Sequence, residues 1–557
     1  MPGSRYDLIL ASSALALILA VPLSGMARDP SKLATAPMAV TFGEQASTQT
    51  STMIVIPTKE VSNDTLADPA SATDPAAMTD PLASLDPADR AIAETLRDLL
   101  ATKLDKVFSS KKEGAAALAL YQNRNFAPVW LDKGVENARA TSAIARMKSA
   151  DTDGLDPGDY KPPNFAGLGP AALAEAELKL THAVLTYARH LQAGRFPYTR
   201  VSRNIELPQA WPDPAVILSS VSNAADAGQA LDKFSPQQEP YRKLRAMLAE
   251  LRGRSGATKG EISKQIEIVI ANMERWRWYP RELGNAHVLV NLPDFTLKVM
   301  NNGTEVWATR IVVGKPSMPT PLLSETMKYI TVNPTWHVPQ SIVQNEYLPA
   351  LAQDPTVLDR MGLRVSYNGG EVQITQPPGD GNALGRIRFN FPNRFSVYQH
   401  DTPDKQLFAD EVRAYSHGCM RVQDPAKYAE VLLNIARPHE RWTAEKIRNM
   451  FGTVEQDIQL QPTQIWVHLT YQTAFIDSAG KLQMRRDVYN LDSRTLAAIK
   501  SDRAIIESAT ERKQEQEMVS GSGANRSARP TRTGANVQST SYEAPIYTRP
   551  TTGPIYR

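Results

Sequence analysis

Cysteine is almost absent from this sequence. The 557 residues include only one, Cys419. A single thiol cannot close a disulfide within the chain, so the sequence excludes a fold held together by a disulfide framework. It also excludes metal sites that use several thiolates.

No sign of charge dominates, and glycine is scarcer than proline. The chain has 62 Lys and Arg against 59 Asp and Glu, a net charge of +3. This balance gives no indication of a nucleic-acid or polyanion partner. The 40 prolines outnumber the 30 glycines, which indicates that part of the length is linker. The length and the 42% hydrophobic content predict several domains with at least one large core.

Long hydrophobic runs are also missing, apart from one near the N-terminus. Residues 1–27 contain Arg5, an apolar run at 8–21, and small residues before position 28. This run is shorter than the roughly 20 residues that span a bilayer, so we expect a signal peptide cleaved after Ala27. A retained membrane tether is the alternative. In an oxidising compartment a free thiol is a liability, which favours a reactive role for Cys419 over that of a small buried hydrophobe.

Composition and hydrophobic periodicity divide the rest of the chain. Residues 28–85 predict a disordered linker, because prolines recur in an Asp-Pro repeat and remove amide donors. Asp86 and Pro87 are typical of a helix start, and 86–270 predicts a helical scaffold with amphipathic helices at 171–191 and 241–251. His182 and His190 lie eight residues apart in the first of these, but without a third ligand they predict no metal site.

Alternating patterns predict a mostly β domain over 271–495, so the fold class is α+β multidomain. The expected strands lie at 287–292, 296–300, 305–313, 328–332, 364–367, 386–391, 395–400 and 465–476. A helical insertion at 341–361 falls within a candidate lid at 338–375. Residues 496–518 predict a helical extension, and 519–557 a disordered, weakly basic tail.

Two histidines, His400 and His417, and the only thiol fall within one stretch of 20 residues. A free thiol has a pKa of about 8.5, so a nucleophilic Cys419 needs a base such as His400 to form the thiolate. His400 ends one predicted strand and Cys419 lies on the next element, so their side chains could face each other. His417 is an alternative, because residues i and i+2 of an extended segment share a side. The amides of Gly418 and Cys419 could form an oxyanion hole, where one donor contributes roughly 3 to 4 kcal/mol.

A papain-like order, with the cysteine before its histidine, would pair Cys419 with His439 or His468 instead. The residues around Cys419 lack the matching context.

Several motifs together resemble the L,D-transpeptidases with a YkuD-type catalytic domain, in particular their long, periplasmic YcbB-like branch. The first is Ser416-His417-Gly418-Cys419-Met420-Arg421 with His400 upstream. The similarity continues in the segments at 333–336, 338–342, 376–379, 385–387 and 400–403, and in the scaffold segments at 121–130, 154–160 and 187–195. It spans roughly residues 90–495. Many members insert a small peptidoglycan-binding module before 272–276, whereas here only a short polar connection follows Arg252.

The resemblance implies a role for each matching residue. Cys419 would be the nucleophile and His400 the general base. The amides of Gly418 and Cys419, with His417, would form the oxyanion environment. Arg421 would bind a substrate carboxylate or pair with a structural acid. The other residues implied at the substrate groove or its edge are Asp401, which could orient the imidazole, and Ser416, Tyr415, Tyr398 and Trp336.

The resemblance further implies a peptidoglycan transpeptidase in the periplasm, with no metal or organic cofactor. Cys419 would form a thioester with a tetrapeptide stem and release D-alanine, and an amine of a neighbouring stem would resolve it to a 3-3 cross-link. Carbapenems would acylate Cys419, and wall-synthesis proteins could be partners. The alternatives are an L,D-carboxypeptidase, an enzyme that links lipoprotein to the wall or cleaves that link, and a non-catalytic wall-binding scaffold.

Overall fold

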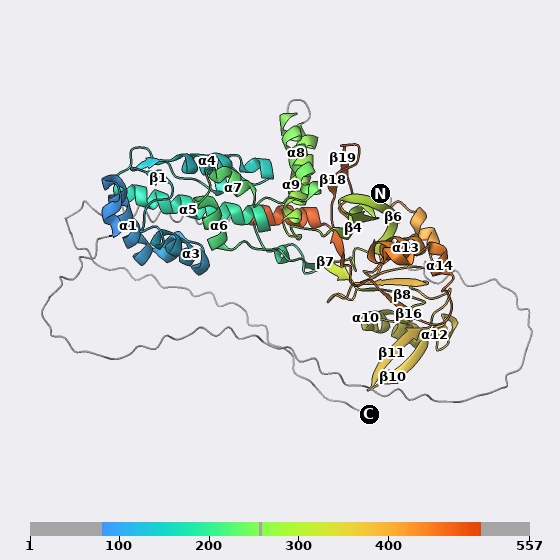
Figure 1. The fold of residues 1–557 in the computed structure, drawn as a ribbon. Helices are drawn as coiled ribbons and strands as arrows, with labels where there is room; N and C mark the ends of the chain where they lie inside the picture. The colour runs from blue at the N-terminus through green and yellow to red at the C-terminus, as the bar shows by residue number, and fades with distance from the viewer. Residues whose placement is uncertain (1–80, 255–258, 503–557) are drawn as a thin grey trace, which may run out of the picture. The chain divides into compact units, whose positions relative to one another are not determined.

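The fold was analysed in a computed structural model, which describes residues 81–254 and 259–502 (Figure 1). The predicted signal peptide, almost all of the linker, most of the helical extension and the basic tail lie outside the described residues. Residues 491–502 are helical. A helical region comes first and a mostly β domain follows, as the sequence predicts.

The helical region is built around one long central helix. Its helices and short strands are α1 Pro87–Thr102, α2 Leu104–Val107, α3 Lys111–Gln122, β1 Leu131–Asp132, β2 Val135–Glu136, α4 Ala138–Lys148, α5 Pro170–Ala193, β3 Ile205–Glu206, α6 Pro214–Ser222, α7 Ala227–Asp232, α8 Glu239–Gly253 and α9 Lys259–Trp276. Asp86 caps α1 by accepting a hydrogen bond from the Ala88 amide, and Pro87 is the first helical residue, which confirms the predicted start.

Helix α5 is buried along most of its length, and α1, α3, α4, α6 and α7 pack around it (Figure 1). Buried Glu177 on α5 accepts hydrogen bonds from the Tyr121 hydroxyl and from the amides of Val129 and Trp130. His190 on α5 is also buried, and its Nδ1 lies 3.2 Å from the Tyr160 hydroxyl. Within the described residues, no three His, Cys, Asp or Glu side chains are grouped to hold a metal ion.

The β domain is organised on a twelve-stranded sheet. Along the sheet the strands follow the order β16, β8, β12, β13, β15, β6, β5, β4, β17, β7, β3, and β14 pairs with β6. The strands of this domain are β4 Ala286–Asn291, β5 Thr296–Asn301, β6 Thr304–Gly314, β7 Leu322–Met327, β8 Tyr329–Val332, β12 Ile387–Asn390, β13 Gln399–His400, β14 Ala414–Ser416, β15 Met420–Val422, β16 Gln456–Gln459, and β17 Ile465–Thr470. A hairpin, β18 Ala474–Ile476 and β19 Leu482–Met484, and the helices α13 Pro425–Ala436 and α14 Ala444–Arg448 complete it.

The helical region contributes one strand to the sheet and two helices to its apolar core. Strand β3, which lies between helices of the helical region, pairs in parallel with β7 at the end of the sheet. Helices α8 and α9 contribute to the same apolar cluster as the strands. Trp276 and Trp278 are fully buried in this cluster, so they pack in the core between the helical region and the sheet.

The candidate lid has its own small core. It consists of β9 Trp336–His337, α10 Gln340–Ile342, a π-helical turn at Val343–Tyr347, α11 Leu348–Gln353, α12 Val357–Arg360, β10 Arg364–Asn368 and β11 Glu371–Gln376. Its buried residues form a cluster separate from the main core, made of Val338, Ile342, Val343, Leu358, Leu363 and Ile374. The lid therefore combines the predicted helices with a β-hairpin.

One predicted strand is mostly wrong. The sequence predicts a strand at 395–400, but only β13 Gln399–His400 is extended. The Asn393 side chain accepts hydrogen bonds from the amides of Phe395 and Val397 and donates to the Val397 carbonyl. Ser396 has a positive φ of 54°. Because these bonds satisfy the backbone locally, the segment turns before it reaches the sheet.

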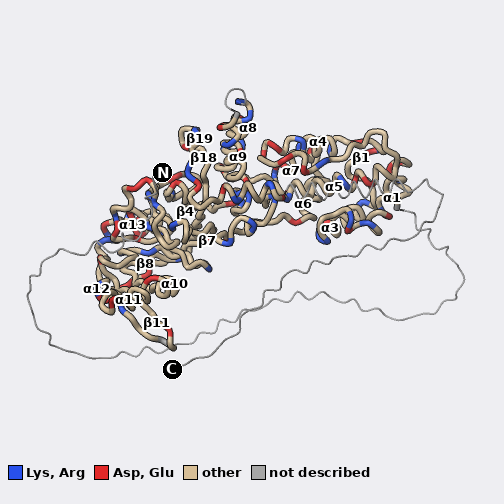
Figure 2. The backbone as a smooth tube through the Cα atoms, turned by 180° about the vertical axis from the view of Figure 1, so that it is seen from behind, with Lys and Arg blue, Asp and Glu red and all other residues tan. Residues whose placement is uncertain are grey.

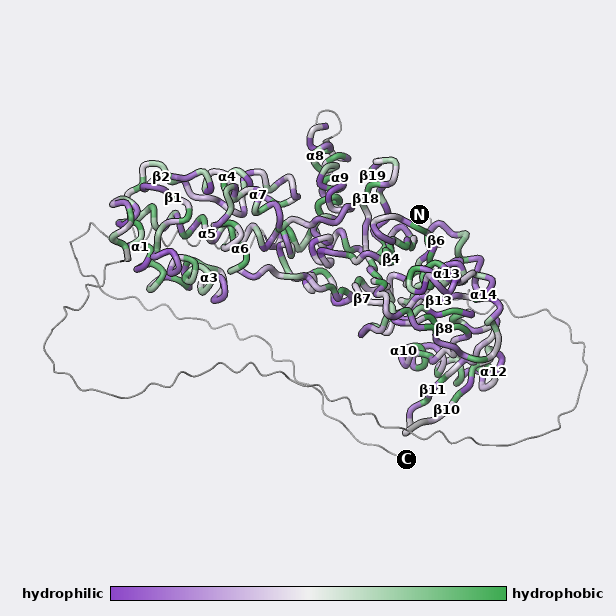
Figure 3. The backbone as a smooth tube through the Cα atoms, in the orientation of Figure 1, coloured by the Kyte–Doolittle hydropathy of each residue, from purple (hydrophilic) through white to green (hydrophobic). Residues whose placement is uncertain are grey.

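Charged and apolar residues are distributed over both regions. In the described residues, Lys and Arg are interspersed with Asp and Glu in both regions (Figure 2). Hydrophobic segments occur in the helices and in the strands alike (Figure 3). None of the helices in the described part of the chain is long and apolar enough to cross a membrane.

Candidate active site

His400 lies on strand β13, and Cys419 comes directly before the neighbouring strand β15. Strands β13 and β15 pair in parallel, with Gln399 opposite Met420 and His400 opposite Arg421. Gln399 and Met420 are fully buried on the core side. Because side chains alternate along a strand, His400 projects from the other face, and so does Cys419 just before β15. Cys419 is partly exposed.

The His400 ring is held by a main-chain group. Its Nδ1 lies 2.5 Å from the carbonyl oxygen of Asp401. A carbonyl can only accept, so Nδ1 carries the proton of the neutral ring and donates it to this oxygen. The lone pair is then on Nε2, which is the atom that can accept a proton from a thiol.

Burial sets the protonation of both groups. It raises the pKa of Cys419 to about 11, although hydrogen bonds from the Tyr398 main chain and side chain and the charges of Arg421 and Arg388 favour the thiolate. Burial also lowers the pKa of His400 to about 3, an effect that the charge of Arg421 increases and the carbonyls of Asp401 and Leu384 oppose. At neutral pH the resting site therefore contains a neutral thiol and a neutral imidazole.

These pKa directions predict the pH dependence of thiol alkylation. Only the thiolate reacts, so the rate of Cys419 alkylation by iodoacetamide should rise about tenfold per pH unit from pH 6 to 9 and not level off. The rate can be followed by intact-protein mass spectrometry. The same chain in denaturant is the control. Its alkylation rate should level off above about pH 8.5, the pKa of a free thiol. A plateau below pH 8 in the folded protein would indicate a preformed thiolate–imidazolium pair and contradict the prediction.

The segment before the cysteine forms a tight, internally bonded loop. The Ser416 hydroxyl donates to the Cys419 carbonyl at 2.5 Å and accepts from the Gly418 amide at 3.2 Å. Gly418 has a φ of 115°, a conformation that disfavours any residue with a side chain. A Cβ at this position would meet no atom closer than 3.6 Å, so the backbone conformation and not the available space requires glycine here.

His417 is joined to the lid instead of the thiol. Its Nε2 lies 2.6 Å from the Glu346 carboxylate in the π-helical turn of the lid and 3.3 Å from Lys315 Nζ. The imidazole is about one-third exposed. This side chain therefore connects the loop of Cys419 to the lid.

The side chains of three further candidate residues, Arg421, Asp401 and Tyr415, form hydrogen bonds or ion pairs with other protein groups. Arg421 pairs with Asp404 at 2.9 Å, which favours the structural alternative for this residue. The Asp401 carboxylate accepts from the amides of Arg386 and Thr402 and pairs with Lys405, so only its main-chain carbonyl contacts the imidazole. Exposed Tyr415 donates to Asp410.

Two aromatic candidates lie at the lid and at the site face. Trp336 is half-buried in β9 and packs edge-on against Tyr347 of the lid. The Tyr398 ring lies 5.8 Å from the His400 ring. Burial raises the pKa of Tyr398, so the phenol remains a donor at neutral pH.

The two other histidines considered for the cysteine are differently placed. Both ring nitrogens of buried His468 in β17 have partners, the Ser324 hydroxyl and the Leu283 carbonyl. His439 is exposed in a short 3₁₀ turn, Pro438–Glu440.

Sequence reasoning missed Glu346, Lys315 and Arg388 at this site. Lys315 and Arg388 are single basic residues without a local motif. Glu346 is 71 residues from His417 in sequence, and no spacing rule relates the two.

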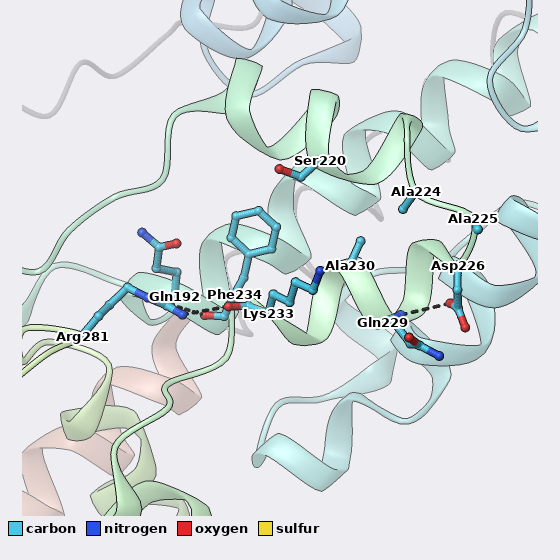
Figure 4. A pocket seen from close by; sticks show the side chains of 10 residues that line it. All are labelled: Gln192, Ser220, Ala224, Ala225, Asp226, Gln229, Ala230, Lys233, Phe234 and Arg281. Atoms are coloured by element: carbon cyan, nitrogen blue, oxygen red, sulfur yellow. Dashed lines mark hydrogen bonds between the residues drawn. The ribbon is translucent and has the colours of Figure 1, made fainter. Parts of the chain in front are cut away.

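A cavity of about 800 Å³ lies elsewhere, in the helical region (Figure 4). It is lined by the end of α5, by α6 and α7, and by Arg281, which donates to the carbonyls of Lys233 and Phe234. None of its lining residues is a nucleophile paired with a base. It therefore offers no rival to the cysteine as a catalytic centre.

Family comparisons match both regions of the chain. Residues 115–248 match the scaffold domain, and residues 285–447 match the L,D-transpeptidase catalytic domain, YkuD. A curated Haemophilus influenzae protein, named as a candidate L,D-transpeptidase, is 26% identical over 409 residues, which are 67% of this chain and 77% of that protein.

Solved structures of L,D-transpeptidases are more distant. One from Mycobacterium smegmatis is 13% identical and has a TM-score of 0.18; the match covers 33% of this chain and 58% of that one. One from Enterococcus faecium is 13% identical with a TM-score of 0.16, over 38% of this chain and 64% of that one. Similarity at this level carries no argument about the site. The family matches show that this chain combines a scaffold domain with a YkuD-type L,D-transpeptidase catalytic domain.

Proposed function

We propose that this protein is an exported peptidoglycan L,D-transpeptidase with Cys419 as its nucleophile. The observation that carries the proposal is the parallel register of β13 and β15. It puts the only thiol and an imidazole whose proton is on Nδ1 on one face of the sheet. The N-terminal sequence supports export to the periplasm, where peptidoglycan is found.

In the first half of the reaction, His400 Nε2 takes the thiol proton as sulfur attacks the carbonyl at the L-centre of diaminopimelate in a tetrapeptide stem. The bond to D-alanine breaks, and the imidazolium returns the proton to the leaving amine. The Gly418 amide is held by Ser416 at rest, so we assign the developing oxyanion first to the Cys419 amide.

In the second half, the side-chain amine of another stem attacks the thioester and loses a proton to His400. The sulfur leaves as thiol, and a 3-3 cross-link remains. Water in place of the amine would give a tripeptide. The lid contact between Glu346 and His417 supports amine transfer, because a lid held next to the cysteine can exclude water.

The test is incubation of the purified protein with disaccharide tetrapeptide, followed by mass spectrometry. We expect a cross-linked dimer that has lost one D-alanine. Tripeptide without dimer would replace the transpeptidase assignment with a carboxypeptidase. Neither product, from folded protein with a thiol that can be alkylated, would contradict both and favour the lipoprotein-linking enzyme or the non-catalytic scaffold.

A further inference from the structure

Arg388 lies beside the catalytic pair, although no sequence motif identifies it. It is in β12, which runs antiparallel to β13 and places Arg388 directly opposite His400. Its neighbour Phe389 is fully buried on the core side. Arg388 therefore projects from the same face of the sheet as His400 and Cys419. Its guanidinium lies 5.7 Å from the centre of the Tyr398 ring.

The protein gives the Arg388 guanidinium few hydrogen-bond acceptors. Among the described residues, Nε of Arg388 is buried and has no hydrogen-bond partner. Its carboxylate partner is Glu455, whose oxygen lies 3.8 Å from the guanidinium, beyond hydrogen-bond distance. Within the described part of the chain, Nε of Arg421 is also buried without a partner, but its guanidinium donates to Asp404 at 2.9 Å, whereas that of Arg388 has no such bond. A buried N–H without an acceptor is costly, so this arrangement favours a ligand that supplies one.

The charge of Arg388 acts on the reacting groups. It lowers the pKa values of Cys419, His400 and Tyr398, although burial has a larger effect on each. Arg388 projects from the same face as the sulfur and its charge acts on the sulfur, so it can also act on a substrate that the sulfur attacks. In the proposed donor, the carboxylate nearest that carbonyl belongs to the terminal D-alanine, one residue beyond the scissile bond.

We propose that Arg388 binds the terminal carboxylate of the donor stem peptide and so positions the scissile carbonyl over Cys419. This inference rests on the proposed function. Arg421 then neutralises Asp404 and does not hold the substrate. The site selects donors that end in a free carboxylate, because a guanidinium fork fits a carboxylate with two parallel hydrogen bonds.

The first experiment compares two donors, a tetrapeptide with a free terminal carboxylate and the same peptide with a terminal carboxamide. The wild-type protein should prefer the free acid by about tenfold to a hundredfold in kcat/KM, the range of a hydrogen bond to a charged group. Arg388→Gln should lose this preference and Arg388→Lys should keep part of it. Equal preference in Arg388→Gln and wild type would overturn the proposal.

Arg386→Gln is the matched control. The side chains of Arg386 and Arg388 are equally exposed, at 18%. Arg386 donates to Asp380 and to the Gly452 carbonyl. Its substitution should leave the preference for the free acid unchanged. A loss of preference as large as that of Arg388→Gln would assign the effect to general positive charge and overturn the proposal.

The second experiment needs no transpeptidase activity. Iodoacetate and iodoacetamide both alkylate the thiolate of the single cysteine, but only iodoacetate carries a carboxylate. The rate of alkylation by iodoacetate divided by that by iodoacetamide should fall at least about threefold in Arg388→Gln. In Arg386→Gln this ratio should stay at its wild-type value. Because both reagents are measured on the same protein, a change in folding or in the thiol pKa cancels in the ratio.

The two experiments separate the possible failures. If the wild type does not turn over either peptide but Arg388→Gln lowers the alkylation ratio, the proposed function fails and the carboxylate site stands. If peptides are turned over and the ratio is the same in wild type and Arg388→Gln, the carboxylate site fails and the function stands.

Discussion

Cys419→Ala should lose all covalent labelling and all peptidoglycan chemistry. Cys419 is the only cysteine, so no second thiol can substitute for it. Wild-type protein incubated with a carbapenem should gain the mass of one inhibitor molecule, in a peptide that contains residue 419. The variant should show no mass gain and no dimer or tripeptide, a decrease in turnover of at least about 10⁴-fold.

Cys419→Ser and a folding measurement are the controls. Serine keeps the shape of the side chain but is a far weaker nucleophile, so this variant should also fail to react while its melting temperature stays near that of wild type. Cys419 is only partly buried, which limits the structural cost of either substitution. An adduct that persists in Cys419→Ala would identify another nucleophile and contradict the proposed reaction. Unimpaired binding of stem peptide without any adduct in wild type would favour the non-catalytic scaffold.

His400→Gln should have the second largest effect, a decrease of about 10² to 10⁴ in the rate of acylation by tetrapeptide or carbapenem at pH 7. Glutamine can still donate to the Asp401 carbonyl, but it cannot take a proton from sulfur. The rate constant for acylation, followed by mass spectrometry at several pH values, measures the effect. At pH 10 iodoacetamide should alkylate the variant nearly as fast as wild type, because hydroxide then generates the thiolate.

His439→Gln is the matched control for this variant. His439 is exposed and is one of the two bases, with His468, that a papain-like order could use. Its substitution should change the acylation rate less than twofold. If His439→Gln lost activity and His400→Gln kept it, the assignment of the general base would be wrong.

Local patterns were enough to predict much of the fold. The Asp-Pro pair at the start of α1 and the apolar periodicity of α5 and α8 depend on residues close in sequence. The order of a helical region and a β domain follows from the same periodicities. The failure at 395–398 has an equally local cause, because the Asn393 side chain satisfies backbone groups that the strand pattern assigns to the sheet.

The site was predictable only in part. Strand patterns indicated that His400 and Cys419 could face each other, but the parallel register that brings β13 beside β15 depends on the whole sheet. The proton on Nδ1 depends on a main-chain carbonyl, which is the same in every residue type. The state of Arg388 depends on which acceptors other segments bring near it. These features arise from tertiary packing, and the spacing of residues in the sequence does not predict them.

The pairing of β3 with β7 bears on how such proteins diversify. Ile205 is buried against the same core as the strands, and its segment lies between helices of the preceding region. Recombination that exchanged the N-terminal region for an unrelated module would strip this strand away and bare the backbone of β7. The helical region and the β domain should therefore be found together in related proteins. A gene fusion that replaces the helical region should give a folded protein only where another strand pairs with the edge of β7.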